Sequence, residues 1–421
     1  MPGLILSAPS SGSGKTTLSL GLLRALARRG IPVRGAKSGP DYIDPRFHEA
    51  ASNAPCMNLD AWAMSPARIR SLAASDDLLL IEGAMGLFDG APPKGKGATA
   101  DLARILNLPV ILVIDAARMA HSVAPIVTGF SNHDPSVQIA GVILNRTGSA
   151  RHENMLRNAL DGNGIPVLGA IPRQTGLGHP SRHLGLVQAQ ERPDLEHFLN
   201  TVADSVAAHV DLDRLIALAS RLPAKTDHAG MPPPAQRIAI AQDAAFAFAY
   251  PHLIQDWRRA GAEIIPFSPL ADDCVPDADL VMLPGGYPEL YAGKIAANLK
   301  FMQSIIKSSQ SIDIYGECGG YMVLGDILID ADNVPHKMAG LLSLQTSFAQ
   351  RKLHLGYRHL SATSGPFTGD FNGHEFHYAT TLKAVGNPLF QATDAEGAAL
   401  PPMGLRSGRV TGSFAHIIDR A

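Results

Sequence analysis

Short apolar runs alternate with helical stretches along the first half of the chain. Continuous apolar runs of this kind are typical of parallel strands that are buried on both faces. They cover residues 4–7, 78–81, 110–114, 139–144 and 167–171, while residues 16–29 carry leucines at helical spacing and residues 195–222 look helical. This alternation of strands and helices along the chain predicts an α/β fold with a doubly wound parallel sheet.

A proline-rich polar stretch, residues 223–234, interrupts this pattern and is interpreted as a linker. After it the pattern starts again, with strands expected at 237–241, 263–267, 280–283 and 312–315, a helix at 250–260 and a more β-like tail. The sequence therefore predicts two α/β domains, one over residues 1–225 and one over residues 236–421.

A phosphate-binding signature opens the first predicted helix. Backbone N–H groups of a glycine-rich loop and of a helix N-terminus bind phosphate oxygens, and the lysine reaches the terminal phosphates. The residues predicted to bind ATP here are Ser11, Gly12, Ser13, Gly14, Lys15, Thr16 and Thr17. The strict eight-residue pattern departs at its first position, which is Pro9. Asn145, at the end of a predicted strand, has an amide that suits an adenine edge.

Carboxylates follow the strands near this loop. Glu82 ends a buried apolar run, where ligands gather in doubly wound sheets, and is a credible Mg²⁺ ligand together with the Thr16 hydroxyl. Asp89 lies in the glycine-punctuated loop that follows. Residues 37–45 place a cation, Lys37, and two carboxylates in a stiff turn.

A second chemical signature is Gly316-Glu-Cys318-Gly-Gly320, directly after an apolar run. Small residues around a nucleophile at a strand end are typical of a sharp elbow that exposes the thiol. Cysteine needs a nearby base, for which His416 is the first candidate and His374 and His377 are rivals. Backbone N–H groups of Gly319 and Gly286 would hold the oxyanion. A nucleotide site and a thiol hydrolase site in one chain indicate a ligase.

Together these motifs resemble the cobyrinic/hydrogenobyrinic acid a,c-diamide synthases of corrinoid biosynthesis. The resemblance covers nearly the whole chain. It rests on residues 8–17, 284–291, 315–322 and 373–378, and most specifically on Lys37-Ser-Gly-Pro-Asp-Tyr-Ile-Asp-Pro-Arg-Phe-His48 and Glu82-Gly-Ala-Met-Gly-Leu-Phe-Asp-Gly90.

The resemblance implies a P-loop domain like dethiobiotin synthetase, followed by a class I-like glutamine amidotransferase domain. It implies that Asp41, Glu82 and Asp89 handle Mg²⁺ and acyl-phosphate formation, with Thr16, Asp41 and Glu82 as the metal ligands. Lys37 and Ile43 would lie at the substrate, Cys318 would be the glutaminase nucleophile, and His416 would raise its reactivity. The implied substrates are the corrinoid acid, whose a and c acetates are amidated, together with ATP and glutamine.

One position departs from the class I pattern. Many of these amidotransferases have a carboxylate two residues after the catalytic histidine, but here that residue is Ile418 and Asp419 lies one further on. Only a Cys–His pair is therefore expected. The segment 404–414 looks more like members that act on the metal-free ring, hydrogenobyrinic acid. Alternatives are amidation of other side chains as in cobyric acid synthase, a nickel tetrapyrrole substrate, or a nucleotide-switched binding protein with a degenerate amidotransferase domain.

Composition limits the environment and the partners. The net charge is -2, so no polybasic footprint favours nucleic acid, and no apolar stretch is long enough for a spanning helix. The three cysteines show no metal or disulfide spacing, and the first residues lack the basic region of a signal peptide. We expect a cytoplasmic enzyme with small-molecule substrates and no nucleic-acid or membrane partner; a homodimer is left open.

Overall fold

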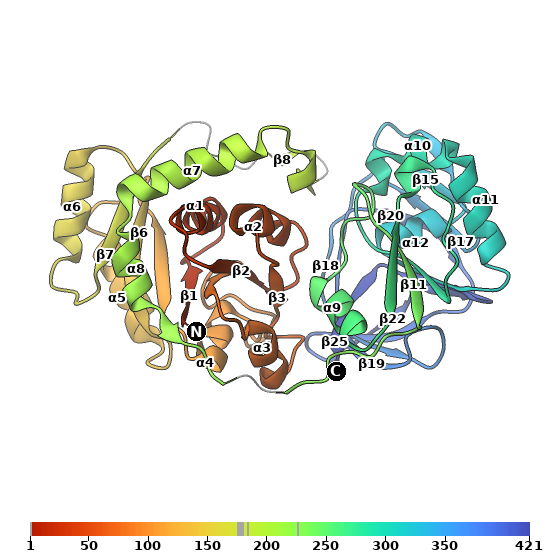
Figure 1. The fold of residues 1–421 in the computed structure, drawn as a ribbon, viewed down its shortest axis with the longest axis horizontal. Helices are drawn as coiled ribbons and strands as arrows, with labels where there is room; N and C mark the ends of the chain where they lie inside the picture. The colour runs from red at the N-terminus through yellow and green to blue at the C-terminus, as the bar shows by residue number, and fades with distance from the viewer. Residues whose placement is uncertain (1, 175–180, 183–184, 225–226) are drawn as a thin grey trace. The chain divides into compact units, whose positions relative to one another are not determined.

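The computed structural model describes residues 2–174, 181–182, 185–224 and 227–421. The chain divides into two compact units, Met1–His228 and Ala229–Ala421. Each unit has its own sheets and its own buried core (Figure 1).

The first unit is built on a sheet of order β3-β2-β4-β1-β5-β6-β7, in which all these neighbours run parallel, while β10 pairs antiparallel with β1. The strands are β1 (Pro2–Ser7), β2 (Val33–Ser38), β3 (Met57–Leu59), β4 (Leu78–Glu82), β5 (Val110–Asp115), β6 (Ile139–Thr147), β7 (Val167–Pro172) and β10 (Ser220–Arg221), with a small ribbon of β8 (Ser181–Arg182) and β9 (Gly185–Leu186). Parallel neighbours bring the carboxyl ends of β1, β2 and β4 to one edge, and the phosphate loop starts there.

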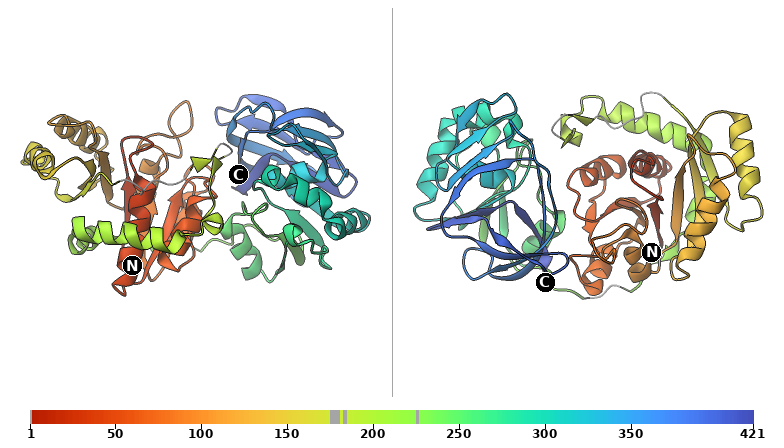
Figure 2. Two further views of the ribbon diagram at one scale, coloured as in Figure 1. Left: turned by 90° about the horizontal axis from the view of Figure 1, so that it is seen from above. Right: turned by 180° about the vertical axis from the view of Figure 1, so that it is seen from behind.

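Helices cover both faces of this sheet. They are α1 (Lys15–Arg28), α2 (Asp44–Ser52), α3 (Pro66–Ala73), α4 (Thr99–Leu106), α5 (Val123–His133), α6 (Ala150–Leu160), η1 (Ala189–Glu191), α7 (Leu195–His209) and α8 (Leu212–Leu218). On one face, leucines of α1 and α7 pack with Leu4, Leu6 and Leu80 in one core, and Figure 2 shows α7 crossing above α1 and α2. The helices α3 and α4 lie on the opposite face (Figure 1). The prediction of a doubly wound parallel sheet is thus confirmed.

The helical expectation for residues 195–222 is wrong in part. The helix α7 ends at His209, α8 runs only from Leu212 to Leu218, and Ser220–Arg221 forms the strand β10. The break lies at Asp211, whose side chain accepts the N–H of Arg214 and so caps a new helix, while its own N–H donates to the carbonyl of Leu168 in β7. The hydrogen bond from the Asp211 N–H to β7 therefore ends α7, and the capping side chain of Asp211 starts α8.

The second unit contains a mainly parallel sheet of order β12-β11-β13-β14-β24-β23, an antiparallel sheet β22-β21-β18-β19-β25, and a mixed sheet β16-β15-β17-β20. Its strands are β11 (Arg237–Ala241), β12 (Glu263–Phe267), β13 (Leu280–Leu283), β14 (Asp313–Glu317), β15 (Ile327–Ile329), β16 (Pro335–Lys337), β17 (Ser343–Ser347), β18 (His354–Ala362), β19 (Gly369–His377), β20 (Thr380–Val385), β21 (Phe390–Asp394), β22 (Ala399–Met403), β23 (Leu405–Ser407), β24 (Val410–Ser413) and β25 (Ala415–Arg420). Its helices are α9 (Pro251–Arg259), η2 (Pro269–Ala271), η3 (Pro288–Leu290), α10 (Ala292–Ala297), α11 (Leu299–Ser308) and α12 (Gly319–Leu324).

The strands predicted from apolar runs in this unit are all present, and the tail is β-rich as expected. Among the described residues, none of the helices combines the length and the apolar character needed to cross a membrane.

Candidate functional site

The phosphate loop of the first unit leads from β1 into α1 and requires glycine at its last turn. Gly14 has a φ of 87°, and a Cβ built on it would lie 2.3 Å from Nδ2 of Asn145. That same amide nitrogen donates to the carbonyl of Ser13 at 2.9 Å. Asn145, predicted to contact adenine, is therefore tied to the loop backbone. All the predicted ATP-binding residues except Ser13 line one cavity of about 600 Å³, which Lys37, Asp41 and Glu82 also line.

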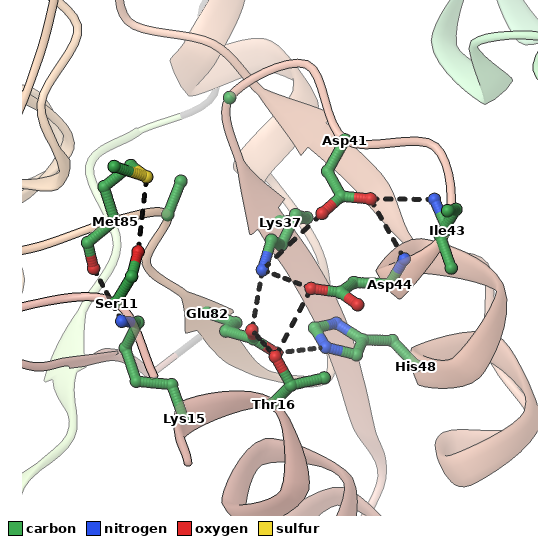
Figure 3. Close-up of polar contacts among 12 residues, drawn as sticks. Ser11, Lys15, Thr16, Lys37, Asp41, Ile43, Asp44, His48, Glu82 and Met85 are labelled. Atoms are coloured by element: carbon green, nitrogen blue, oxygen red, sulfur yellow. Dashed lines mark hydrogen bonds and ion pairs between the residues drawn. The ribbon is translucent and has the colours of Figure 1, made fainter. Parts of the chain in front are cut away.

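Lys15 is held by main-chain carbonyls. Its Nζ donates to the carbonyl oxygen of Met85 at 2.6 Å (Figure 3) and to that of Ser10 at 3.1 Å. Burial lowers the pKa of Lys15. Met85 itself is exposed and has a φ of 50°, a left-handed backbone that is uncommon for a residue with a side chain. Carbonyl oxygens thus hold the ammonium group that the sequence assigns to terminal phosphates.

A buried cluster of charges lies next to this loop. The Nζ of Lys37 is 2.6 Å from Oε1 of Glu82 and 2.6 Å from Oδ2 of Asp44, while Oδ2 of Asp41 is 4.0 Å away. The Thr16 hydroxyl donates to Oε1 of Glu82 at 2.6 Å and also faces Oδ2 of Asp44 at 3.4 Å (Figure 3). The cluster forms because β2 and β4 are parallel neighbours in which Lys37 and Glu82 are Cα partners.

The charges in this cluster stabilise one another. Burial alone would lower the pKa of Lys37, but the carboxylates of Asp44 and Glu82 outweigh it and raise the pKa. Burial would raise the pKa of Glu82, and Lys37 and His48 bring it well below its usual value. His48 places Nε2 2.7 Å from Oε2 of Glu82, and against the effect of burial its neighbours Cys56 and Glu82 raise its pKa to about 10. Glu82 therefore stays ionised between two cations.

Asp41, Ile43 and Asp89 lie differently. Asp41 accepts the N–H groups of Ile43 and Asp44 at 2.8 and 3.1 Å, in an Asx turn that directly precedes α2 (Figure 3). Burial, followed by the charge of Asp44, raises the pKa of Asp41 to about 6. Ile43 is half-buried and packs partly on the core. Asp89 is exposed and accepts the N–H of Gly86 at 2.8 Å within its own loop.

Two members of the cluster, Asp44 and His48, were not assigned a role from the sequence. Both lie on α2, four residues apart, so they project from the same side of the helix toward Glu82. Their spacing within the specific segment 37–48 is a signal that could have identified them. What the sequence could not show is that β4, which carries Glu82, lies next to β2.

The thiol of the second unit lies on a strained turn between β14 and α12. Cys318 has a φ of 47° and a ψ of -102°, and a Cβ on Gly320 would lie 1.9 Å from the carbonyl oxygen of Leu283. These values support the elbow that the flanking glycines predict. Cys318 is buried; burial raises its pKa well above the usual value, whereas the N–H of Gly319 acts in the opposite direction.

His416, on β25, lies beside this thiol. A Cβ built on Gly285 would lie 3.0 Å from Nε2 of His416 and 3.3 Å from Cβ of Cys318, so the absence of a side chain at Gly285 leaves room for both. The nitrogen of Gly286 would lie 3.1 Å from a Cβ on Gly319, which brings the two predicted oxyanion donors to the same place.

The rival histidines have other partners. His374 is the cross-strand partner of His416, and burial, then the charge of His416, lower its pKa to about 3. His377 hydrogen-bonds to Glu375 at 3.0 Å, and its ring stacks on Phe414. His354, Glu375 and His377 bring three ligand-type atoms close together. The rings of His354 and His377 are stacked at an interplanar angle of 8°. The lone pair of an imidazole nitrogen lies in the plane of its ring. The lone pairs of these two histidines therefore lie in separate, nearly parallel planes and do not converge on one ion.

Comparisons with known proteins agree with this division into two units. The family model of the CobQ/CobB/MinD/ParA nucleotide binding domain matches residues 4–187, and that of the CobB/CobQ-like glutamine amidotransferase domain matches residues 237–420. Three similar proteins are named hydrogenobyrinate a,c-diamide synthase. They come from Brucella anthropi (54% identity, 100% of this chain and 99% of the relative), Rhodobacter capsulatus (52%, 99% and 98%) and Rhizobium meliloti (51%, 100% and 99%).

Proposed function

Because the chain belongs to the hydrogenobyrinate a,c-diamide synthase family, we propose that it amidates the a and c acetate groups of hydrogenobyrinic acid in cobalamin biosynthesis, with ATP and glutamine as co-substrates. The observation that carries this proposal is the presence, in one chain, of a phosphate loop beside a buried carboxylate cluster and of a thiol elbow beside a histidine. The names of the relatives favour the metal-free ring over cobyrinic acid.

In the proposed ATP-binding domain, residues 1–225 of the first unit, the proposed step is formation of an acyl phosphate. A carboxylate oxygen of the acetate attacks the γ-phosphorus of ATP, the bond to the bridging oxygen breaks, and ADP leaves. This chemistry depends on positioning and on positive charge around the phosphate. Lys15 would exchange the carbonyl oxygens of Met85 and Ser10 for phosphate oxygens. Asp41 and Asp89, with Lys37 and Ile43, are proposed to face the acetate.

The oxygen donors beside the loop fit Mg²⁺. Thr16, Asp44 and Glu82 direct a hydroxyl and two carboxylate oxygens at one region, where the protein already accommodates the positive charge of Lys37. Hard oxygen ligands of this kind, completed by phosphate and water, are what Mg²⁺ prefers. Asp41 is proposed as a further ligand. A bound Mg²⁺ would supply positive charge that offsets the repulsion between substrate acid and phosphate.

In the proposed amidotransferase domain, residues 236–421 of the second unit, the proposed step is release of ammonia from glutamine. His416 takes the proton of the Cys318 thiol, the sulfur attacks the side-chain amide carbon, and the N–H groups of Gly286 and Gly319 stabilise the oxyanion. His416 then returns the proton to the leaving nitrogen, which departs as ammonia and leaves a thioester that water hydrolyses. Ammonia then attacks the acyl phosphate and displaces phosphate.

The test is amidation by the purified full-length protein with each ring acid, ATP, Mg²⁺ and either glutamine or ammonium, followed by mass spectrometry. We expect two successive replacements of OH by NH₂ on hydrogenobyrinic acid. The variant Cys318→Ala should lose the glutamine-driven reaction and keep the ammonium-driven one, because only the nitrogen source is lost. Cys274→Ala, at an exposed cysteine, is the matched control and should retain both.

Other results would count against the proposal. If the wild-type protein amidates neither ring, or if it prefers cobyrinic acid, the proposed substrate is wrong. If Cys318→Ala retains glutamine-driven synthesis, Cys318 is not the nucleophile.

A further inference from the structure

The His416 side chain has a carboxylate neighbour that the class I pattern does not predict. Two residues after His416 the chain has Ile418, whose side chain carries no polar group. Glu317 lies instead beside His416, with Oε2 at 3.5 Å from Nδ1 of the imidazole. Both side chains are buried, at 4% and 1% exposure. The carboxylate comes from the end of β14 and the imidazole from β25, so the contact joins two sheets.

Two other donors fix the Glu317 carboxylate. Its Oε1 accepts the N–H of Ile417 at 3.1 Å and the hydroxyl of Tyr315 at 3.2 Å. Tyr315 is fully buried, and burial together with Glu317 raises its pKa, so the hydroxyl remains a donor. With Oε1 bound from both sides, the second oxygen, Oε2, is directed at His416. A buried carboxylate with hydrogen bonds of this kind keeps a fixed orientation.

The imidazole lies between the carboxylate and the thiol. Its Nδ1 faces Glu317, while its Nε2 lies on the side of Gly285, where a methyl group added to that glycine would touch both Nε2 and Cβ of Cys318. A carboxylate at Nδ1 favours the tautomer in which Nδ1 carries the proton and Nε2 is free to accept one. The other charged groups near the thiol are Glu289 and Glu375, and His374 faces His416 from β19.

We propose that Glu317 is the positioning residue of the Cys318–His416 pair. From β14, in another sheet, it would have the role that class I amidotransferases give to a carboxylate after the histidine. The inference rests on the proposed glutaminase function. Glu317 does not take up the thiol proton. The thiol proton moves to Nε2 of His416 and then to the leaving nitrogen, while Glu317 holds the Nδ1–H and stabilises the imidazolium that forms.

The test compares Glu317→Gln with Glu375→Gln in the full-length protein. Glu375→Gln is the matched control because it also removes a buried carboxylate near the thiol, but one that contacts His377 and Arg358 instead. We expect Glu317→Gln to lower kcat for glutamine hydrolysis at least about tenfold with KM nearly unchanged, because binding of glutamine does not require the proton transfer. In the control, Glu375→Gln, kcat for glutamine hydrolysis should fall much less.

The pH profile separates this role from a structural one. Without the neighbouring negative charge the imidazolium is less stable. Because His416 must be unprotonated to accept the thiol proton, the acidic limb of the kcat/KM profile should move about half a pH unit or more to lower pH in Glu317→Gln. Ammonium-driven synthesis should stay at the wild-type rate. A kcat within about twofold of wild type, or an unmoved acidic limb, would overturn the proposal.

A folding defect is detected separately. Unfolding of the second unit is followed through the emission of the buried Trp257, in a Trp62→Phe background. If Glu317→Gln is unfolded, Tyr315→Phe decides, because it removes one of the donors that fix the carboxylate and leaves the charge. Tyr315→Phe should also lower kcat for glutamine hydrolysis, and an unchanged kcat would overturn the proposal. Failure of the glutaminase hypothesis is distinct: Cys318→Ala would then hydrolyse glutamine like the wild type.

Discussion

At the residue scale, the buried ammonium group of Lys37 links charged side chains of the first unit. Lys37 is shared between Asp44 and Glu82, and His48 bonds the second oxygen of Glu82. When one partner of a buried ion pair is removed, an uncompensated charge remains in a medium of low polarity. The same cluster contacts the phosphate loop through Thr16, so the charges that stabilise the fold also hold the oxygen atoms that we propose as Mg²⁺ ligands.

The variant Lys37→Met should therefore destabilise the first unit by about 3–5 kcal/mol in the absence of Mg²⁺. Arg28→Met is the control, because Arg28 forms an exposed pair with Asp204 that is worth about 0–1 kcal/mol. Urea unfolding followed through Trp62, in a Trp257→Phe background, measures both. Added Mg²⁺ should restore part of the loss in Lys37→Met only; equal losses in the two variants would contradict the buried cluster as the cause.

The candidate site could be predicted from the sequence where a residue type carries its own chemistry. The glycines before Lys15 and around Cys318 indicate tight turns, and each turn is present. Partners were harder to predict. His48 contacts Glu82 and Glu317 contacts His416, each far away in the sequence, and both contacts depend on which strands pack together. The order β2-β4-β1 and the closeness of β14 to β25 arise from packing, which a single sequence does not reveal.

At the scale of elements, β19 distributes its polar side chains by the alternation of a strand. Glu375 and His377 bond to each other, whereas His374 points to the other face, toward His416 and Tyr357. Glu375 is also paired with Arg358, and these partners outweigh burial and lower its pKa to about 2. For His374, burial is the main cause of the low pKa, and the weaker attraction of Glu375 does not offset it.

A pH dependence of stability follows from His374. Its pKa is about 3 in the folded protein and about 6.5 in the unfolded chain, so the unfolded state binds more protons between these values. The free energy of unfolding of the second unit should therefore fall as the pH is lowered from 7 to 5, by on the order of 1 kcal/mol per pH unit below the unfolded pKa. His374→Asn should flatten this slope, whatever its effect on absolute stability.

Urea unfolding through Trp257, in a Trp62→Phe background, measures the slope at each pH. The range ends at pH 5 because the carboxyl group of Glu375 contributes a slope of the same sign below about 4.5. His121→Asn, at an exposed histidine of the first unit, is the control and should leave the slope unchanged. An unaltered slope in His374→Asn would mean that another group titrates.

Most elements could be predicted from the sequence because parallel strands buried on both faces leave continuous apolar runs. The run at 110–114 becomes β5 (Val110–Asp115) and the run at 167–171 becomes β7 (Val167–Pro172). The segment 195–222 differed because amphipathic spacing continues across Asp211, where a backbone bond to β7 and a new cap interrupt the helix. The short strand β10 carries no apolar pattern of its own, since it exists only through pairing with β1.

At the scale of the whole molecule, the two units have separate cores, and each contains one of the two tryptophans of the chain. Trp62 is buried in the first unit and Trp257 in the second, with exposures of 3% and 0%. Each tryptophan therefore reports on the unfolding of its own unit. We propose that the nucleotide binds to one unit and that the thiol chemistry takes place in the other. This proposal can be tested by finding which of the two unfolding transitions a ligand shifts.

We expect Mg²⁺ and ATP to stabilise the first unit selectively. A ligand that binds only the folded state at about 100 times its Kd adds about 2.7 kcal/mol to the free energy of unfolding. The Trp62 transition should move to higher urea by that amount, while the Trp257 transition stays where it is, because the phosphate loop and its carboxylates all belong to the first unit. Gly14→Ala provides the control: its Cβ would overlap the amide of Asn145, so the shift should disappear. If both tryptophans shift together in the wild type, the units unfold as one cooperative body; if only Trp257 responds, the nucleotide site has been assigned to the wrong unit.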